Sequence, residues 1–276
     1  MTIRDVLRQA SARLEAAGVL NADYDAAVML GHVMDEDALM LRMNSWKEMP
    51  QDKLEGYEAI IARREKREPM QYILGSTGFM GLTFHVEPGV LIPRPDTEIL
   101  CEEALRRLAP GARVLDIGTG SGALAVSIAR LAKGCDVTAV DVSDAALRIA
   151  AGNAEHSGAS VRFVKSDCFA ALEGEKFDMI VSNPPYINSE EMAQLMDEVR
   201  QEPELALFGG EDGLDFYRRI SREAGVHLKD GGCLLFEIGW QQKDAVSDLL
   251  RKYIGEPFAL KDYGDNWRVV GAVKTK

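Results

Sequence analysis

The residues best suited to hold a planar substrate are Asn183, Pro184, Pro185 and Tyr186, which follow a short apolar run at residues 177–181. Each proline lacks a backbone N–H, so the carbonyls of this loop remain free to accept hydrogen bonds from a substrate. The Asn183 side-chain oxygen and the Pro184 carbonyl can together accept both hydrogens of an sp² NH₂ group, while Tyr186 covers the face of that group. A stiff turn without a ligand is the alternative interpretation.

A glycine-rich segment, "VLDIGTGSGALAVSIA" at residues 114–129, provides a second candidate site. Asp116, Gly118, Gly120 and Gly122 fall at a predicted strand-to-helix turn, where glycine permits a close approach of backbone to ligand. Asp116 precedes the loop and suits a cationic group better than a pyrophosphate, and Asp141 ends the next predicted strand, where a carboxylate can accept from ribose hydroxyls. The set fits S-adenosylmethionine; a dinucleotide site and a ligand-free turn are the alternatives.

A third group of residues follows the next predicted strand, in "KSDCFAAL" at residues 165–172. Asp167 can accept a hydrogen bond from an adenine amino group, and Cys168 or Phe169 can pack on the adenine ring. An ordinary acidic turn is the alternative interpretation of this segment.

The elements that must position these residues fall into two groups. Residues 1–74 read as four or five short helices with apolar residues at helical spacing, and residues 75–95 as a hairpin linker rich in glycine and proline. Residues 96–276 alternate between predicted strands and helices, which indicates a doubly wound, mostly parallel α/β sheet of seven strands. The predicted strands are residues 113–117, 136–140, 161–165, 177–181 and 232–238, and a closing antiparallel pair near the end of the chain. The predicted helices of this region are residues 96–108, 123–131, 144–156, 215–227 and 243–252.

Composition narrows the class of protein. The chain has 276 residues and a formal net charge of −12. Residues 1–90 and the rest of the chain are both acidic, so neither part carries the basic footprint of a nucleic-acid-binding protein. The four cysteines and four histidines are scattered, which predicts free thiols and no metal site. No apolar run is long enough for a membrane span or a signal peptide, so we expect no membrane partner and a cytoplasmic location.

Together these features predict an N-methyltransferase that acts on a planar nitrogen. Adenine N6, cytosine N4 and a glutamine amide would all fit the Asn-Pro-Pro-Tyr loop. Such a direct displacement depends on alignment more than on acid–base chemistry, because the proton can leave after the carbon–nitrogen bond forms. A nicotinamide-dependent oxidoreductase would need a proton donor or acceptor near the cofactor, and a non-catalytic adaptor would not need the loop.

Several segments resemble the peptide chain release factor glutamine N5-methyltransferases (PrmC, also called HemK). They are "YILGSTGFMGLTFHVEPGVLIPRPDTE" (72–98), the glycine loop, "SNPPYI" and "EPELALFGGEDGLDFYRRI" (202–220), and the similarity runs essentially end to end. The resemblance implies a class I methyltransferase fold and methylation of the glutamine in the Gly-Gly-Gln motif of release factors. It also implies that residues 1–74 bind the release factor and that residues 96–276 form the methyltransferase domain.

The resemblance further implies site residues. The cofactor contacts would be Gly118, Thr119, Gly120, Ser121, Gly122, Asp141, the position of Cys168, and Asn183, while residues 183–186 would hold the glutamine. The chain departs from the family at Asp96, where glutamate is frequent, and at Cys168, where an aromatic residue is frequent. A relative that methylates a ribosomal-protein glutamine, or less favourably adenine N6, is the alternative function.

Overall fold

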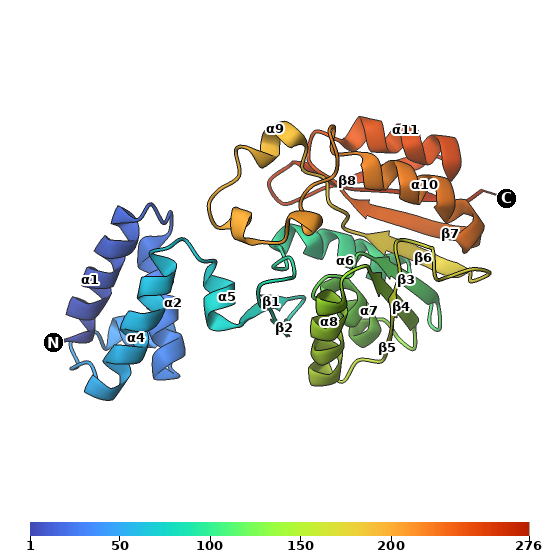
Figure 1. Cartoon of the computed structure of the whole chain (residues 1–276). Coiled ribbons are helices and arrows are strands. Elements are labelled where there is room, and N and C mark those ends of the chain that lie inside the picture. The colour runs from blue at the N-terminus through green and yellow to red at the C-terminus, as the bar shows by residue number, and fades with distance from the viewer. Residues whose placement is uncertain (276) are drawn as a thin grey trace. The chain divides into compact units, whose positions relative to one another are not determined.

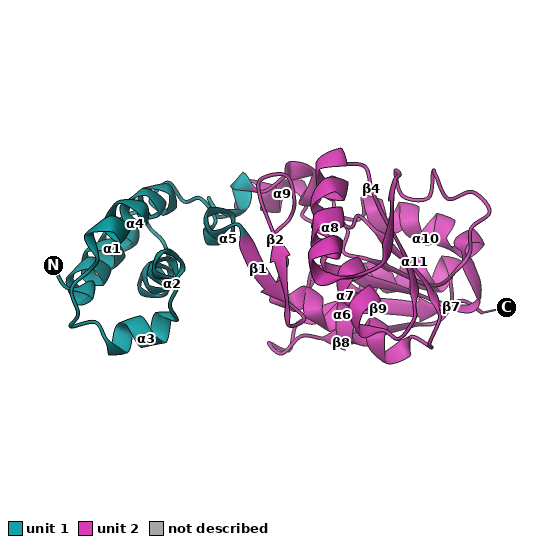
Figure 2. Cartoon of the chain, turned by 90° about the horizontal axis from the view of Figure 1, so that it is seen from below, with its two compact units in different colours: residues 1–75, 196–201 teal, residues 76–195, 202–276 magenta. Residues whose placement is uncertain are grey.

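The computed structural model describes residues 1–275, and these divide into two compact units. Unit 1 contains residues 1–75 together with 196–201, and unit 2 contains residues 76–195 and 202–276; Figure 2 colours them separately. The chain therefore leaves unit 2 after Leu195 and re-enters it at Glu202.

Unit 1 is a small helical bundle. Its helices are α1 (Ile3–Ala16), α2 (Ala22–Met34), α3 (Ala38–Met43), α4 (Gln51–Arg64) and α5 (Met70–Leu74). The helix α1 begins at a capping box formed by Thr2 and Asp5, and it buries Ile3, Val6, Ala10 and Leu14 on one face. The short helix α5 has no counterpart among the sequence predictions, because five residues are too few to show a helical period.

A buried ionic cluster attaches residues 196–201 to the helices of unit 1. The Arg64 guanidinium donates to Asp25 Oδ2 at 2.8 Å and contacts Glu198 at 3.0 Å, and only 8% of the Arg64 side chain is exposed. The Arg67 guanidinium donates to both oxygens of Glu198, at 2.7 and 2.6 Å. Paired, planar contacts of this kind are the geometry in which arginine binds carboxylates most strongly.

Unit 2 begins with the predicted hairpin. Strands β1 (Ser76–Phe79) and β2 (Leu82–His85) pair in antiparallel fashion and reverse direction at Met80 and Gly81. Pro88 and Gly89 form a separate turn after β2.

The sheet of unit 2 has seven strands in the order β5-β4-β3-β6-β7-β9-β8. The strands are β3 (Arg113–Ile117), β4 (Asp136–Asp141), β5 (Val161–Lys165), β6 (Phe177–Ser182), β7 (Leu228–Glu237), β8 (Pro257–Lys261) and β9 (Trp267–Val273). Neighbouring strands from β5 to β7 are parallel, and β9 pairs antiparallel with both β7 and β8. The predicted mostly parallel, seven-stranded sheet is confirmed, although β7 starts four residues earlier than the sequence suggested.

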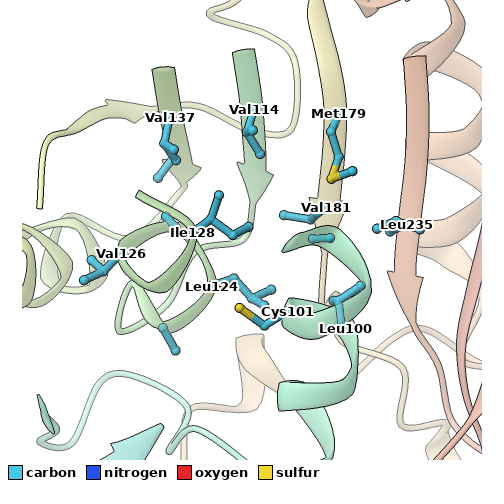
Figure 3. Close-up of a cluster of buried hydrophobic side chains, with 14 of the residues drawn as sticks. Leu100, Cys101, Val114, Leu124, Val126, Ile128, Val137, Met179, Val181 and Leu235 are labelled. Atoms are coloured by element: carbon cyan, nitrogen blue, oxygen red, sulfur yellow. The ribbon is translucent and has the colours of Figure 1, made fainter. Parts of the chain in front are cut away.

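Helices cover both faces of this sheet (Figure 1). They are α6 (Pro95–Arg107), α7 (Ala123–Leu131), α8 (Asp144–Ser157), α10 (Asp215–His227) and α11 (Lys243–Tyr253), with the single turn α9 (Ser189–Met192) in the loop after β6. Val114 and Val181 face α6 and α7, as Figure 3 shows, whereas Leu115 and Ile180 belong to the core under α10 and α11. Because successive residues of a strand point to opposite faces, this division explains why these strands are apolar throughout.

The strand order reverses between β3 and β6, and this reversal positions the site. The chain passes outward from β3 to β4 and β5, then returns to the other side of β3 as β6. Ile117 pairs with both Val140 and Ser182, so the residues that follow these three strands meet at one end of the sheet. Ligands of doubly wound sheets bind at such a point.

Candidate functional site

The glycine loop follows β3 directly. The Gly118 and Thr119 N–H groups both donate to the Val140 carbonyl, at 2.9 and 3.0 Å, which folds the loop over the end of β4. Gly118 has a φ of +73°, and a Cβ added there would meet no atom within 4 Å. Gly122 is different, because a Cβ there would lie 3.0 Å from the Ala150 Cβ on α8. The first glycine thus leaves space for a ligand, and the last allows close helix packing.

Asp141, at the end of β4, receives two backbone N–H groups. Its Oδ2 accepts from Gly120 N at 2.9 Å, and its Oδ1 accepts from Ser143 N at 2.9 Å. Each carboxylate oxygen has a second lone pair, so the group can still accept from a diol while the backbone fixes its orientation.

Asp116 is a buried carboxyl with one unsatisfied oxygen. The Thr119 hydroxyl donates to Oδ2 at 2.7 Å, and Oδ1 has no hydrogen-bond partner among the described residues. Burial, with a smaller contribution from the nearby Asp141 charge, raises the pKa of Asp116 to about 7. A buried carboxyl without a donor or cation is costly, so this oxygen is suited to a ligand that supplies one.

The remaining loop residues support this arrangement from within. Thr119 is used by its bond to Asp116, and the Ser121 carbonyl accepts from the Asn153 side chain of α8 at 2.8 Å. The Thr119 and Ser121 side chains are both buried.

Asn183 follows β6 and is held by its nitrogen. Asn183 Nδ2 donates to the Thr97 hydroxyl on α6 at 3.2 Å, and the preceding Ser182 hydroxyl donates to the Ile117 carbonyl at 2.7 Å. Within residues 1–275, no donor bonds to Asn183 Oδ1 or to the Pro184 carbonyl. Two acceptors therefore remain available beside the glycine loop.

The segment at residues 207–213 braces this loop from behind. Ile187 N donates to the Leu207 carbonyl and Gly209 N donates to the Ile187 carbonyl, both at 2.9 Å. A Cβ at Gly209 would lie 2.6 Å from the Pro185 carbonyl oxygen, so only glycine permits this approach. The Gln242 side-chain amide also donates to the Tyr186 carbonyl at 3.0 Å. The close approach explains the first glycine of the "FGGEDG" sequence.

One cavity of about 160 Å³ lies between these groups. Of the residues predicted from sequence, it is lined by Gly118, Gly120, Asp141, Asp167, Cys168, Asn183, Pro184 and Pro185. Asp116, Thr119, Ser121, Gly122, Phe169 and Tyr186 are outside this lining. The Tyr186 side chain is partly buried against the core under α10 and α11, and its burial raises its pKa.

The third predicted group is divided by the structure. Cys168 lines the cavity, and burial raises the pKa of its thiol to about 11. Phe169 instead stacks on the His227 ring, with centroids 4.5 Å apart and planes inclined by 7°. Asp167 lines the cavity, but its Oδ1 also accepts from Arg219 at 2.6 Å. Of the two residues predicted to pack on an adenine ring, Cys168 lines the cavity and Phe169 does not.

Comparison with known proteins identifies the family. A family model described as the PrmC N-terminal domain matches residues 5–75, and one described as the methyltransferase small domain matches residues 83–204. The release factor glutamine methyltransferase of Geobacter sulfurreducens is 43% identical over 272 residues, which cover 98% of this chain and 96% of the relative. That of Clostridium acetobutylicum is 42% identical and covers 99% of both chains. The chain belongs to the release factor glutamine methyltransferases.

Solved structures share much of the fold of this chain. A methyltransferase from Pyrococcus furiosus has 24% identity and a TM-score of 0.56, covering 71% of this chain and 91% of its own. The T. Thermophilus 16S rRNA N2 G1207 methyltransferase, in complex with AdoMet and guanosine, has 25% identity and a TM-score of 0.53, covering 72% of this chain and 49% of its own. The predicted class I methyltransferase fold is confirmed, and the names of the relatives do not favour a ribosomal-protein or adenine substrate.

Sequence reasoning missed several site residues of this release factor glutamine methyltransferase. Leu205, Ala206, Phe216 and Ile220 line the cavity, and all lie in the 202–220 segment that resembles the family. Glu202 anchors that segment, because its buried carboxylate accepts from Ile92 N at 3.0 Å and pairs with Arg94. Thr97 lies in the "PRPDTE" sequence, and Glu237 ends β7; only the fold reveals that both lie behind Asn183.

Two further properties concern the whole of the described chain. No cluster of three or more His, Cys, Asp or Glu side chains in residues 1–275 is arranged to hold a metal ion. The helices in the same range are all too short or too polar to cross a bilayer.

Proposed function

We propose that this protein transfers a methyl group from S-adenosylmethionine to the side-chain amide nitrogen of the glutamine in the Gly-Gly-Gln motif of peptide chain release factors. The observation that carries this proposal is that one cavity is lined by both the glycine loop and Asn183-Pro184-Pro185. Membership of the release factor glutamine methyltransferases supplies the substrate class.

The residues of the cofactor half fit S-adenosylmethionine. The unsatisfied Asp116 Oδ1 suits a cationic or N–H-bearing group, and the remaining lone pairs of Asp141 suit two ribose hydroxyls. The open space above Gly118 and Gly120 allows a ligand to contact the backbone. When bound, this cofactor supplies a methyl group on a positively charged sulfur, which is open to displacement by a nucleophile.

Asn183 and Pro184 would orient the glutamine amide. Asn183 Oδ1 and the Pro184 carbonyl accept one amide hydrogen each, which fixes the nitrogen in the cavity with its lone pair directed away from both acceptors. Fixed orientation of two reactants can lower a barrier by roughly 7–11 kcal/mol. No general base is needed at the displacement step, because the nitrogen can lose its proton after the new bond forms.

The two prolines and the loop behind them keep these acceptors in place. Pro184 and Pro185 have fixed φ angles and no N–H group, so the loop cannot satisfy its own carbonyls by a small rotation. Gly209 and Gln242 hold the Pro185–Tyr186 backbone from the other side. Preorganised acceptors need little rearrangement when the substrate enters.

We infer that unit 1 binds the release factor, and that the reaction takes place in the cytoplasm, where translation terminates. Large apolar side chains are exposed on this unit at Leu20, Tyr24, Leu39, Met43 and Trp46. Such side chains could contribute apolar contacts to a bound protein. The match of residues 5–75 to the PrmC N-terminal domain supports the same assignment.

The test is transfer of radiolabelled methyl groups to purified release factor, run beside a release factor whose Gly-Gly-Gln glutamine is replaced by alanine. We expect label in the first protein and none in the second. Equal labelling of the two would refute the proposed acceptor, and label in neither would refute the proposed substrate.

A further inference from the structure

Asn183 can act as an acceptor for the substrate only if its amide has one of two orientations. With Nδ2 toward Thr97, as observed at 3.2 Å, Oδ1 is free for the substrate. Rotation of the amide by 180° would present Nδ2 to a substrate group that is itself a donor. The two orientations have the same shape, so hydrogen bonding behind the side chain must select between them.

The proton of the Thr97 hydroxyl makes this selection. A hydroxyl has a single proton, and if that proton is donated elsewhere, Thr97 can only accept from Asn183. Thr97 is 4% exposed, so water does not readily compete for this proton. The orientation of Asn183 therefore depends on a second acceptor that bonds to Thr97.

Glu237 is placed to be that acceptor. It ends β7, and because Ser182 pairs with Phe236, Glu237 lies beside Asn183 in the sheet. The Thr97 hydroxyl lies close enough to this carboxyl to lower its pKa, against the larger effect of burial, and Glu237 Oε2 has no hydrogen-bond partner among the described residues. The Tyr217 hydroxyl donates to the Glu237 backbone carbonyl at 2.8 Å and fixes the end of the strand.

A purely structural role does not explain this carboxyl. Glu237 is 1% exposed and is part of no ion pair within 4 Å among residues 1–275. The nearby Arg268 bonds instead to Asp96 and Asp262, at 3.1 and 3.0 Å. A buried, unpaired carboxyl costs stability that an apolar or amide residue would not, so its presence indicates a function.

We propose that Glu237 is a positioning residue for the reaction: it accepts the Thr97 proton, so that Thr97 accepts from Asn183 Nδ2 and Asn183 Oδ1 faces the substrate amide. The inference rests on the proposed function, since it assigns the role of Asn183 in holding the glutamine. Only the ionised carboxyl is restricted to accepting, because a protonated one could itself donate to Thr97.

This restriction makes the reaction depend on pH. Burial raises the pKa of Glu237 to about 7. The charged and titratable groups that face it are Arg268 on β9, Asp96 and Arg94 at the start of α6, Tyr186 after β6 and Tyr217 on α10. The wild-type kcat should therefore rise with pH through about 7, and this rise should disappear in Glu237→Gln.

The experiment measures kcat and KM for release factor methylation at saturating S-adenosylmethionine, together with cofactor Kd by calorimetry and Tm at pH 8. Thr97→Val removes the hydroxyl at nearly constant shape, and we expect it to lower kcat about 10- to 100-fold with cofactor Kd within about threefold of wild type. Thr97→Ser restores the hydroxyl and should recover activity to within about threefold of wild type. Glu237→Gln should lower kcat about tenfold while Tm at pH 8 stays equal to or above that of wild type, because a buried charge is removed.

The matched control is Ser127→Ala, which removes a different buried hydroxyl, one with no hydrogen-bond partner among the described residues. Its kcat should equal that of wild type. The inference is overturned if Thr97→Val retains wild-type kcat, if Thr97→Ser is as slow as Thr97→Val, or if Glu237→Gln keeps the wild-type pH profile. Absence of release factor labelling by the wild-type enzyme would instead refute the proposed function and the inference together.

Discussion

Behind each half of the cavity lies a buried carboxyl beside a threonine, although the backbones that line the two halves differ. The cofactor half has a buried carboxyl, Asp116, beside a threonine hydroxyl, and the substrate half has Glu237 beside Thr97. Each carboxyl has one oxygen without a partner in the described chain. The cofactor half, however, is built on glycines and the substrate half on consecutive prolines.

This difference matches the chemistry of the two ligands. Glycines allow a ligand to approach N–H groups and carbonyls closely, which suits a large nucleoside. Prolines remove the donors and leave stiff acceptors, which suits an amide with two hydrogens to give. We propose that Asp116 acts on its ligand directly, whereas Glu237 acts through Thr97 and Asn183.

The largest effect should come from removing the direct acceptor of the substrate half. Asn183→Ala should lower kcat at least about 100-fold, because the amide nitrogen loses its orientation. Cofactor Kd, measured by calorimetry, should change less than about fivefold. A variant that loses cofactor binding but keeps kcat at saturating cofactor would show that Asn183 belongs to the cofactor half instead.

Both buried carboxyls should make the protein less stable as the pH rises. Burial raises the pKa of Asp116 from 3.8 to about 7 and that of Glu237 from 4.5 to about 7. At a pH between the unfolded-state and folded-state pKa values, these carboxyls are ionised in the unfolded chain but still protonated in the folded chain. Their contribution to the free energy of unfolding is therefore greatest below about pH 4.5 and falls as the pH rises to about 7. The cost is on the order of 3 kcal/mol for each group.

This pH dependence can be measured by urea unfolding at pH 5.5 and pH 8. The double variant Asp116→Asn, Glu237→Gln should lose most of the difference in stability that the wild type shows between these conditions. An unchanged difference in the double variant would assign the pH dependence to other groups.

The direct role of Asp116 predicts a smaller effect, confined to the cofactor. Asp116→Asn should raise cofactor Kd by about 10- to 50-fold, since a charge-assisted contact is replaced by a neutral one. Wild-type affinity should also improve as the pH rises through about 7, because the ionised carboxyl binds a cationic group more strongly. Calorimetry at pH 6 and pH 8 checks both, and a variant with the wild-type pH dependence would contradict the assignment.

The smallest effect should come from alanine at a glycine of the cofactor loop, and a second glycine outside the site distinguishes lost ligand contact from backbone strain. Gly118 and Gly111 have φ angles of +73° and +76°, and a Cβ at either position meets no atom within 4 Å. Alanine at each should cost about 1 kcal/mol of stability. Only Gly118→Ala should also weaken cofactor binding, so equal Kd values for the two variants would place the ligand away from Gly118.

The local features of the fold could be predicted well from sequence. Strands β3 and β5 and helices α7 and α10 match their predicted bounds, because apolar period, glycine turns and caps are encoded within a few residues. The single turn α9 and the early start of β7 could not be predicted in this way, because short elements and strand extensions depend on packing against other segments of the chain.

The candidate site was predictable only where each residue follows a strand. Gly118, Asp141 and Asn183 could be placed at one end of the sheet from the strand order alone. Phe169 could not be excluded from the cavity, because its stacking partner His227 is 58 positions away in the chain. Thr97 and Glu237 were missed for the same reason, as their relation to Asn183 depends on three elements packing together.

The inclusion of residues 196–201 in unit 1 has a consequence for dissecting the protein. A fragment that stops at Gly75 would retain Arg64 and Arg67 but lack Glu198, which both contact. Arg64 would keep Asp25, whereas Arg67 would lose both of its carboxylate contacts on residues 197 and 198. Binding studies of the helical bundle therefore need a peptide supplied in trans or a grafted acidic segment, since the isolated N-terminal piece lacks the carboxylates that Arg64 and Arg67 contact.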